Sequence, residues 1–192
     1  ASGSATIAVR RYQRMLAQVA AQIPTTSKVI LLADRGFGHI DLMKVATQLG
    51  WHFRIRLKSD TWIYLANGKR RQIRTLMPPV GKGRCYAHVW ITDQKYGPLH
   101  LAIAQVITPN GTEKWAIISD EPVGRHTFDE YGLRFNIEEN FLDDKSAGFN
   151  LEDSLLQDSM AISRLCLILA TATVYLVSTG SAVVACGLRP VV

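Results

Sequence analysis

The chain has 192 residues, of which 47% are hydrophobic and 20% charged, with Gly 14 and Pro 7. These values are those of a soluble globular domain, and they exclude a disordered tail and a low-complexity chain. The three cysteines, Cys85, Cys166 and Cys186, stand at wide spacings that fit neither a disulfide framework nor a zinc site. No signal peptide is apparent in the first 25 residues, so we expect a protein of the reducing cytoplasm.

Charge is distributed unevenly around a net value of +6. Residues 51–84 hold nine Lys and Arg against one acid, whereas residues 119–158 hold eleven of the sixteen acids. A basic stretch suits a polyanion such as nucleic acid, although a solvated basic surface explains it equally well. A compact acidic region beside it is typical of enzymes that hold metal ions next to nucleic acid.

The first 58 residues predict a unit of α/β type. Residues 8–22 have the pattern of a helix, and residues 28–33 form a continuous apolar run that predicts a buried strand. Helical spacing over 39–49 ends at Gly50, and residues 51–57 (WHFRIRL) alternate like a strand. The order strand, helix, strand indicates an α/β fold.

The next stretch, residues 59–119, predicts antiparallel hairpins, because short alternating runs are separated by turns at Asn67-Gly68 and at residues 109–111. A helix is then expected from about 128 to 147, with Thr127 and Glu130 forming a capping box. An apolar helix is expected from about 158 to 177. We divide the chain accordingly into residues 1–58, 59–119 and 120–192.

Asp34 is the first residue with candidate chemistry. It follows directly after the buried strand 28–33, at the carboxyl end, where open α/β sheets place functional groups. An aspartate after a strand is also an ordinary turn or capping residue, so its position alone leaves both roles open.

The second candidate is the helix predicted after residue 127. At helical spacing, Tyr131, Arg134, Glu138 and Lys145 lie on one narrow stripe. An apolar stripe of Leu133, Ile137 and Phe141 runs beside it and is expected to be the buried flank. The alternative is an exposed face with favourable charge pairs, but Glu138 and Lys145 stand two turns apart, too far for an ordinary pair.

The spacing Tyr131-x2-Arg134-x3-Glu138-x6-Lys145 resembles the Tyr-Arg-Glu-Lys signature of the DDE transposases of bacterial insertion sequences. Residues 34–37 (DRGF) are similar to that family's motif around its second catalytic aspartate. The resemblance covers roughly residues 28–178. It implies an RNase H-like catalytic core, with the first strands missing, an antiparallel β insertion over 59–119 and C-terminal helices that pack on the core.

The resemblance also implies roles for individual residues. Asp34 and Glu138 would be the second and third members of an acidic triad that ligates two Mg²⁺ or Mn²⁺ ions. Tyr131, Arg134 and Lys145 would hold phosphates beside the scissile position. Trp115 would stack on a base flipped from the duplex, although a core tryptophan on a strand is the more ordinary explanation.

The implied activity is metal-dependent cleavage and strand transfer on double-stranded DNA at transposon ends, performed by a homodimer. The family's first catalytic aspartate has no counterpart, because residues 1–33 contain no Asp or Glu. We therefore expect an incomplete transposase that does not cleave DNA by itself.

Two other hypotheses remain. A DNA-binding remnant would keep the fold and the basic stretch but lack catalysis. A membrane-anchored protein would use residues 165–187, which are 23 residues without a charge. The five histidines show no metal-binding spacing, so we expect no zinc site.

Overall fold

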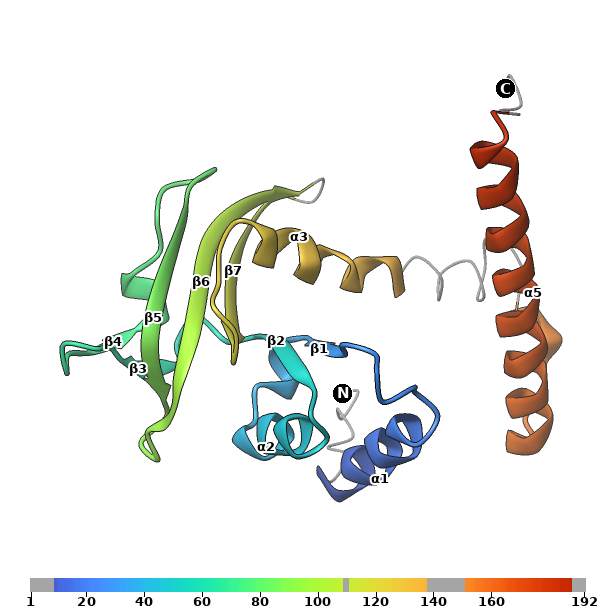
Figure 1. Ribbon diagram of the computed structural model, residues 1–192, viewed down its shortest axis with the longest axis horizontal. Coiled ribbons are helices and arrows are strands. Elements are labelled where there is room, and N and C mark those ends of the chain that lie inside the picture. The colour runs from blue at the N-terminus through green and yellow to red at the C-terminus, as the bar shows by residue number, and fades with distance from the viewer. Residues whose placement is uncertain (1–8, 109–110, 138–150, 188–192) are drawn as a thin grey trace. The chain divides into compact units, whose positions relative to one another are not determined.

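Seven strands form one mixed sheet in the order β1-β2-β7-β6-β5-β3-β4 (Figure 1). The computed structural model describes residues 9–108, 111–137 and 151–187. The chain divides into two compact units, residues 1–134 and 135–192, of which the first contains the whole sheet. The mixed sheet with its helices confirms the predicted α/β class with an RNase H-like core.

The first unit begins with α1 (Val9–Ala20), β1 (Ile30–Ala33), α2 (Ile40–Gln48) and β2 (His52–Arg56). Each begins and ends within two residues of the element predicted for it. The pair β1 and β2 is parallel, with Ala33 opposite Ile55, and α2 is the connection between them. Parallel neighbours need a crossover connection of this kind, and the predicted order of strand, helix and strand supplies it.

The hairpins predicted over residues 59–119 are also present. They comprise β3 (Trp62–Tyr64), β4 (Arg70–Gln72), β5 (Gly83–Ile91), β6 (Tyr96–Thr108) and β7 (Gly111–Ser119), all antiparallel to their neighbours. Gly68, in the β3–β4 turn, has a φ of 77°, a left-handed conformation that glycine adopts without strain. Because β7 pairs with β2, these strands extend the α/β sheet rather than forming a separate one.

The two faces of β2 differ sharply. Phe53 and Ile55 are 0% exposed and belong to the apolar core, to which α1 and α2 also contribute (Figure 1). The alternate residues, His52, Arg54 and Arg56, point to the opposite face. The alternation in WHFRIRL therefore places polar groups on the face of the sheet that α3 covers, away from the apolar core.

Helix α3 (His126–Gly132) differs from prediction at its start, and residues 134–137 continue as helix. The predicted capping box was wrong, because the N-cap is Arg125 and no side chain caps it. Thr127 is buried and its hydroxyl accepts the N–H of Gly124, while Glu130 pairs with Arg54. The predicted end near residue 147 lies outside the described residues.

The prediction that Leu133 and Ile137 lie on a buried flank of this helix was wrong. Leu133 is 60% exposed, Ile137 is 51% exposed and Tyr131, assigned to the polar stripe, is 0% exposed. The helix turns Tyr131 toward the sheet because this large aromatic ring packs against Trp115. Phe141 lies outside the described residues.

A buried arginine joins α3 to the sheet. Arg54 is 2% exposed, and its Nε lies 3.0 Å from Glu130 Oε2, while its Nη2 lies 2.9 Å from Glu121 Oε2. Its Nη1 donates to the hydroxyl of Ser119, the residue opposite it on β7, and to the carbonyl of Phe53. We call Arg54, Ser119, Glu121 and Glu130 the Arg54 network. It neutralises a buried cation with two carboxylates and ties β2, β7 and α3 together.

A second group of charged side chains lies beside the Arg54 network and shares Glu121 with it. His52 Nδ1 lies 2.7 Å from Asp120 Oδ2, and the other oxygen of Asp120 accepts the backbone N–H of Phe53. The Nζ of Lys28 lies 2.7 Å from Glu121 Oε1. Burial by itself raises the pKa of Glu121, but hydrogen bonds from Lys28 and Arg54 and the nearby charges of His52 and Arg54 outweigh it, so the pKa is lowered.

In the second unit, α5 (Ser159–Ala185) is longer than the predicted helix. It begins at Asp158, whose side chain accepts the N–H of Ala161, and it continues to Cys186-Gly187 because no proline interrupts the apolar run. By length and composition it is able to cross a membrane, and large side chains such as Leu167 and Tyr175 are 69% and 70% exposed. The expected packing of this helix on the sheet stays a prediction.

The Arg54 network predicts that replacing Arg54 lowers the free energy of unfolding much more than replacing the exposed Arg71. Arg54→Leu leaves the carboxylates of Glu121 and Glu130 without their buried partner, so we expect a loss of about 3–5 kcal/mol in the free energy of unfolding. Arg71→Leu on exposed β4 is the matched control, with an expected change within about 0.5 kcal/mol. Urea unfolding followed by circular dichroism measures both, and equal losses would contradict the assigned role.

Glu121 predicts how stability responds to acid. Because its pKa is lower in the folded chain than the ordinary 4.5, its contribution to stability is complete above that pH and is lost as the pH falls through the folded pKa. We expect the melting temperature of wild type to fall more steeply below pH 4.5 than that of Glu121→Gln. Parallel slopes for the two proteins would show that Glu121 does not carry this linkage.

Candidate functional site

Asp34 lies at the carboxyl end of β1, as predicted. Since Ala33 pairs with Ile55, Asp34 lies beside Arg56 at the same edge of the sheet. It precedes a short 3₁₀ turn over residues 35–37, but its side chain makes no capping hydrogen bond. Its Oδ1 is buried and has no hydrogen-bond partner among the described residues. A capping role is therefore absent, and a buried carboxylate oxygen is left for a ligand.

Tyr131 lies in the middle of a charged cluster. Burial raises the pKa of its hydroxyl, and the nearby carboxylate of Asp34 adds to the rise, while Arg134 and Arg56 act against it. The hydroxyl therefore keeps its proton at neutral pH and can act as a hydrogen-bond donor. These electrostatic interactions bring Asp34 and two arginines around one buried phenol.

Arg134 and Trp115 complete the surroundings of the tyrosine ring. The guanidinium of Arg134 lies 5.7 Å from the centre of the Tyr131 ring, and the Trp115 ring meets it edge to face at 5.3 Å. Trp115 is 6% exposed. Tyr131 thus contacts both Arg134, on the continuation of α3, and Trp115 on β7.

Two further residues belong to this site, and sequence reasoning missed their role in it. Glu113 Oε2 lies 3.0 Å from Arg56 Nη1 and accepts a hydrogen bond from Trp115 Nε1 at 3.1 Å. Arg56 also donates to the carbonyl of Lys114. The available signal was the alternation in WHFRIRL, which places Arg56 on the same face as Asp34 once the register is known. We call Asp34, Arg56, Glu113, Trp115, Tyr131 and Arg134 the Asp34 cluster.

Glu138 and Lys145, the remaining predicted site residues, lie outside the described residues. Among the residues that are described, no three or more His, Cys, Asp or Glu side chains gather as a metal site.

The basic stretch 51–84 does not act as a single surface. Arg54 is buried in its network, and Arg56 belongs to the Asp34 cluster. The other basic residues are exposed, namely Lys58, Lys69, Arg70, Arg71, Arg74, Lys82 and Arg84. Only this last set is placed to meet a polyanion directly.

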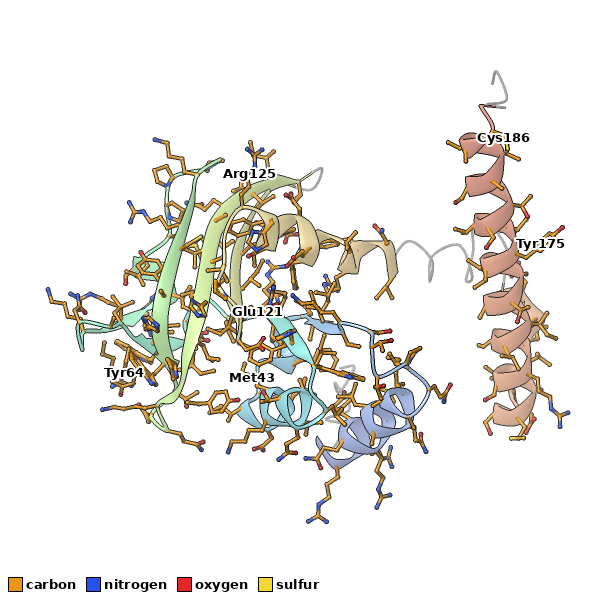
Figure 2. All side chains as sticks on the ribbon, in the orientation of Figure 1. Met43, Tyr64, Glu121, Arg125, Tyr175 and Cys186 are labelled. Atoms are coloured by element: carbon orange, nitrogen blue, oxygen red, sulfur yellow. The ribbon has the colours of Figure 1, made fainter. Side chains whose placement is uncertain are left out.

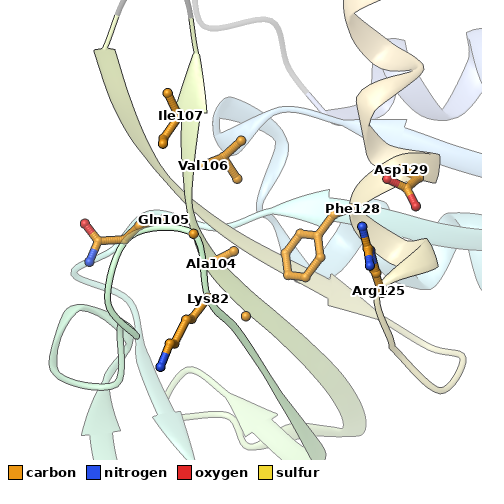
Figure 3. A pocket seen from close by; sticks show the side chains of 10 residues that line it. Lys82, Ala104, Gln105, Val106, Ile107, Arg125, Phe128 and Asp129 are labelled. Atoms are coloured by element: carbon orange, nitrogen blue, oxygen red, sulfur yellow. The ribbon is translucent and has the colours of Figure 1, made fainter.

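An open groove of about 610 Å³ lies between the concave side of β6 and the first turn of α3 (Figure 3). Phe128 projects into it from α3, and Lys82 and Arg125 line it from opposite sides. Ala104, another lining residue, stands opposite Trp115 across the strand pair. The groove therefore lies on the same face of the sheet as Trp115 of the Asp34 cluster.

Comparison with known proteins shows the family of this chain. A family model described as "Transposase DDE domain" matches residues 9–175, which include the sheet, α3 and the greater part of α5. No curated protein matches the chain significantly. Enzymes of this class transfer phosphoryl groups on DNA, and domains of this family generally use divalent metals. The chain belongs to the DDE transposase family.

Proposed function

We propose that this chain carries part of the active site for metal-dependent cleavage and strand transfer at the ends of an insertion sequence. The observation that supports it is the buried, unpartnered Oδ1 of Asp34 beside Tyr131 and Arg134. A carboxylate for metal and a cation for phosphate are the two groups that this reaction needs side by side.

Asp34 and Glu138 would hold Mg²⁺ or Mn²⁺, which prefer hard carboxylate oxygens. The orphaned Oδ1 of Asp34 fits such an ion, because a ligand there would satisfy a buried acceptor. Two bound metals would supply activation of water or of a 3′-hydroxyl, and stabilisation of the leaving oxygen. With two of three carboxylates in residues 1–192, the chain alone is proposed to be inactive.

The remaining residues would position the DNA. Arg134 and Lys145 would bind phosphates beside the scissile bond, while Tyr131 would contribute a neutral, directional donor. Arg56, held by Glu113, would add positive charge close to Asp34. Trp115 would stack on a flipped base, for which its buried ring must first become accessible.

Double-stranded DNA and a second subunit are the proposed partners, and the cytoplasm is the proposed location. Family members are normally soluble, and the family match extends through residue 175, well into α5. This supports a role for α5 within the transposase domain rather than as a membrane anchor.

Nicking tests the proposal directly. The chain is expressed together with whatever coding sequence precedes residue 1, and a supercoiled plasmid carrying both DNA flanks of the gene is the substrate. We expect Mg²⁺-dependent nicks at the element ends, and their complete loss in Asp34→Asn and Glu138→Gln, because each removes a ligand charge.

The matched control is Asp41→Asn on α2, an exposed aspartate that should nick at the wild-type rate. Wild-type nicking by Asp34→Asn would refute its metal role. Specific DNA binding without any nicking in the longer protein would favour the non-catalytic remnant instead.

The proposed DNA contacts predict that substitutions at Arg134 and at Tyr131 affect the salt dependence of DNA binding differently. Arg134→Gln removes one phosphate contact, so the slope of log affinity against log salt should become shallower by about 0.9 for an end duplex. Tyr131→Phe removes a neutral donor and should weaken binding without changing the slope. Fluorescence anisotropy between 50 and 200 mM salt, roughly the range where such contacts dominate, measures both. An unchanged slope in Arg134→Gln would exclude a phosphate contact.

A further inference from the structure

Three aromatic side chains gather on one face at the far edge of the sheet. Trp62 and Tyr64 are next-nearest neighbours on β3, and Trp90 of β5 stands directly opposite Tyr64. Ile63 between them is 0% exposed and faces the core, so these rings share the outer face. Trp62 is 42% exposed. We call Trp62, Tyr64 and Trp90 the aromatic platform.

Cations lie over two of these rings. The guanidinium of Arg70 is 4.4 Å from the centre of the Trp62 ring and 5.7 Å from that of Tyr64. The ammonium of Lys95 is 5.2 Å from the Tyr64 ring. Asp93 fixes the arrangement, since it pairs with Arg70 at 3.0 Å and accepts from the Tyr64 hydroxyl at 3.3 Å.

A shallow groove opens beside the platform. It has a volume of about 340 Å³ and is lined by Tyr64, Leu65, Ala66, Gly68, Trp90 and Lys95. Lys58, Lys69 and Arg74, in the segments that flank β3 and β4, are exposed and add positive charge to this edge of the sheet. A flat ring can enter this groove, and an anion beside it would meet excess positive charge.

This surface is separate from the Asp34 cluster. In the sheet, β2, β7, β6 and β5 lie between β1 and β3, and Tyr64 is found at the outer edge in Figure 2. Nothing in the proposed chemistry at Asp34 uses the platform. It therefore needs its own explanation.

We propose that the aromatic platform binds single-stranded DNA, with unpaired bases stacked on its rings and the backbone held by Arg70, Lys95 and the basic residues beside them. Exposed aromatic faces interleaved with cations are the means by which proteins hold single strands without sequence preference. A duplex offers few free base faces, since its bases stack on one another. The binding needs no metal, and only its use in transposition rests on the function proposed above.

The test uses the full chain with a fluorescein-labelled dT₂₀ strand in EDTA, followed by anisotropy. Trp62→Leu and Tyr64→Leu are each expected to weaken binding about tenfold, the loss typical of one stacked base. Trp62→Phe keeps a ring and should retain most of the affinity. Tyr175→Leu on α5, which also removes an exposed aromatic, is the matched control and should bind like wild type.

Tryptophan emission provides a second readout. Trp51 and Trp115 are 8% and 6% exposed, so quenching by dT₂₀ should come from Trp62 and Trp90 and should fall in Trp62→Phe. Asp34→Asn should leave dT₂₀ binding unchanged, which separates failure of the platform from failure of the metal site. Unchanged dT₂₀ affinity in both leucine variants overturns the proposal. So does a loss of affinity for a duplex of equal length that is as large in these variants as the loss for dT₂₀, because a platform for unpaired bases should not affect a duplex.

Discussion

The arrangement of the candidate site depends on one buried cation. Arg54 is 2% exposed and reaches Glu130 on α3 and Glu121 on the segment that leads to it. Tyr131 directly follows Glu130, so the ion pair fixes the part of α3 that faces Asp34. An uncompensated guanidinium at this depth would be strongly unfavourable, and both carboxylates must therefore stay in place for the sheet and helix to remain together.

The position of Arg54 also explains why the candidate site lies on one face of the sheet. Strand β2 pairs in parallel with β1 and antiparallel with β7, and its alternate residues point to opposite sides. Its apolar residues complete the core, while Arg54 and Arg56 face α3. The first of these arginines is structural and the second belongs to the Asp34 cluster. A basic stretch that looks uniform in sequence thus serves at least two purposes.

Sequence patterns predicted the strands and helices well, because periodicity reports directly on burial. They predicted Asp34 at a strand end, and the family signature placed Tyr131 and Arg134 together. They failed on α3, where Leu133 was expected to be buried, because spacing alone does not say which stripe faces a neighbour. Sequence patterns also missed that Glu130 pairs with Arg54 and that Glu113 pairs with Arg56. These partners are far apart along the chain, and only the strand register brings them near each other.

Asp34 is proposed to mark a metal site on the α3 face of the sheet. The most direct measurement replaces Mg²⁺ with Fe²⁺ and generates hydroxyl radicals at the bound ion with ascorbate and peroxide, so that the polypeptide is cut beside the metal. We predict cuts near Asp34 and within residues 131–138, both abolished by Asp34→Asn or by excess Mg²⁺. Cuts elsewhere, or cuts that persist in Asp34→Asn, would contradict the claim.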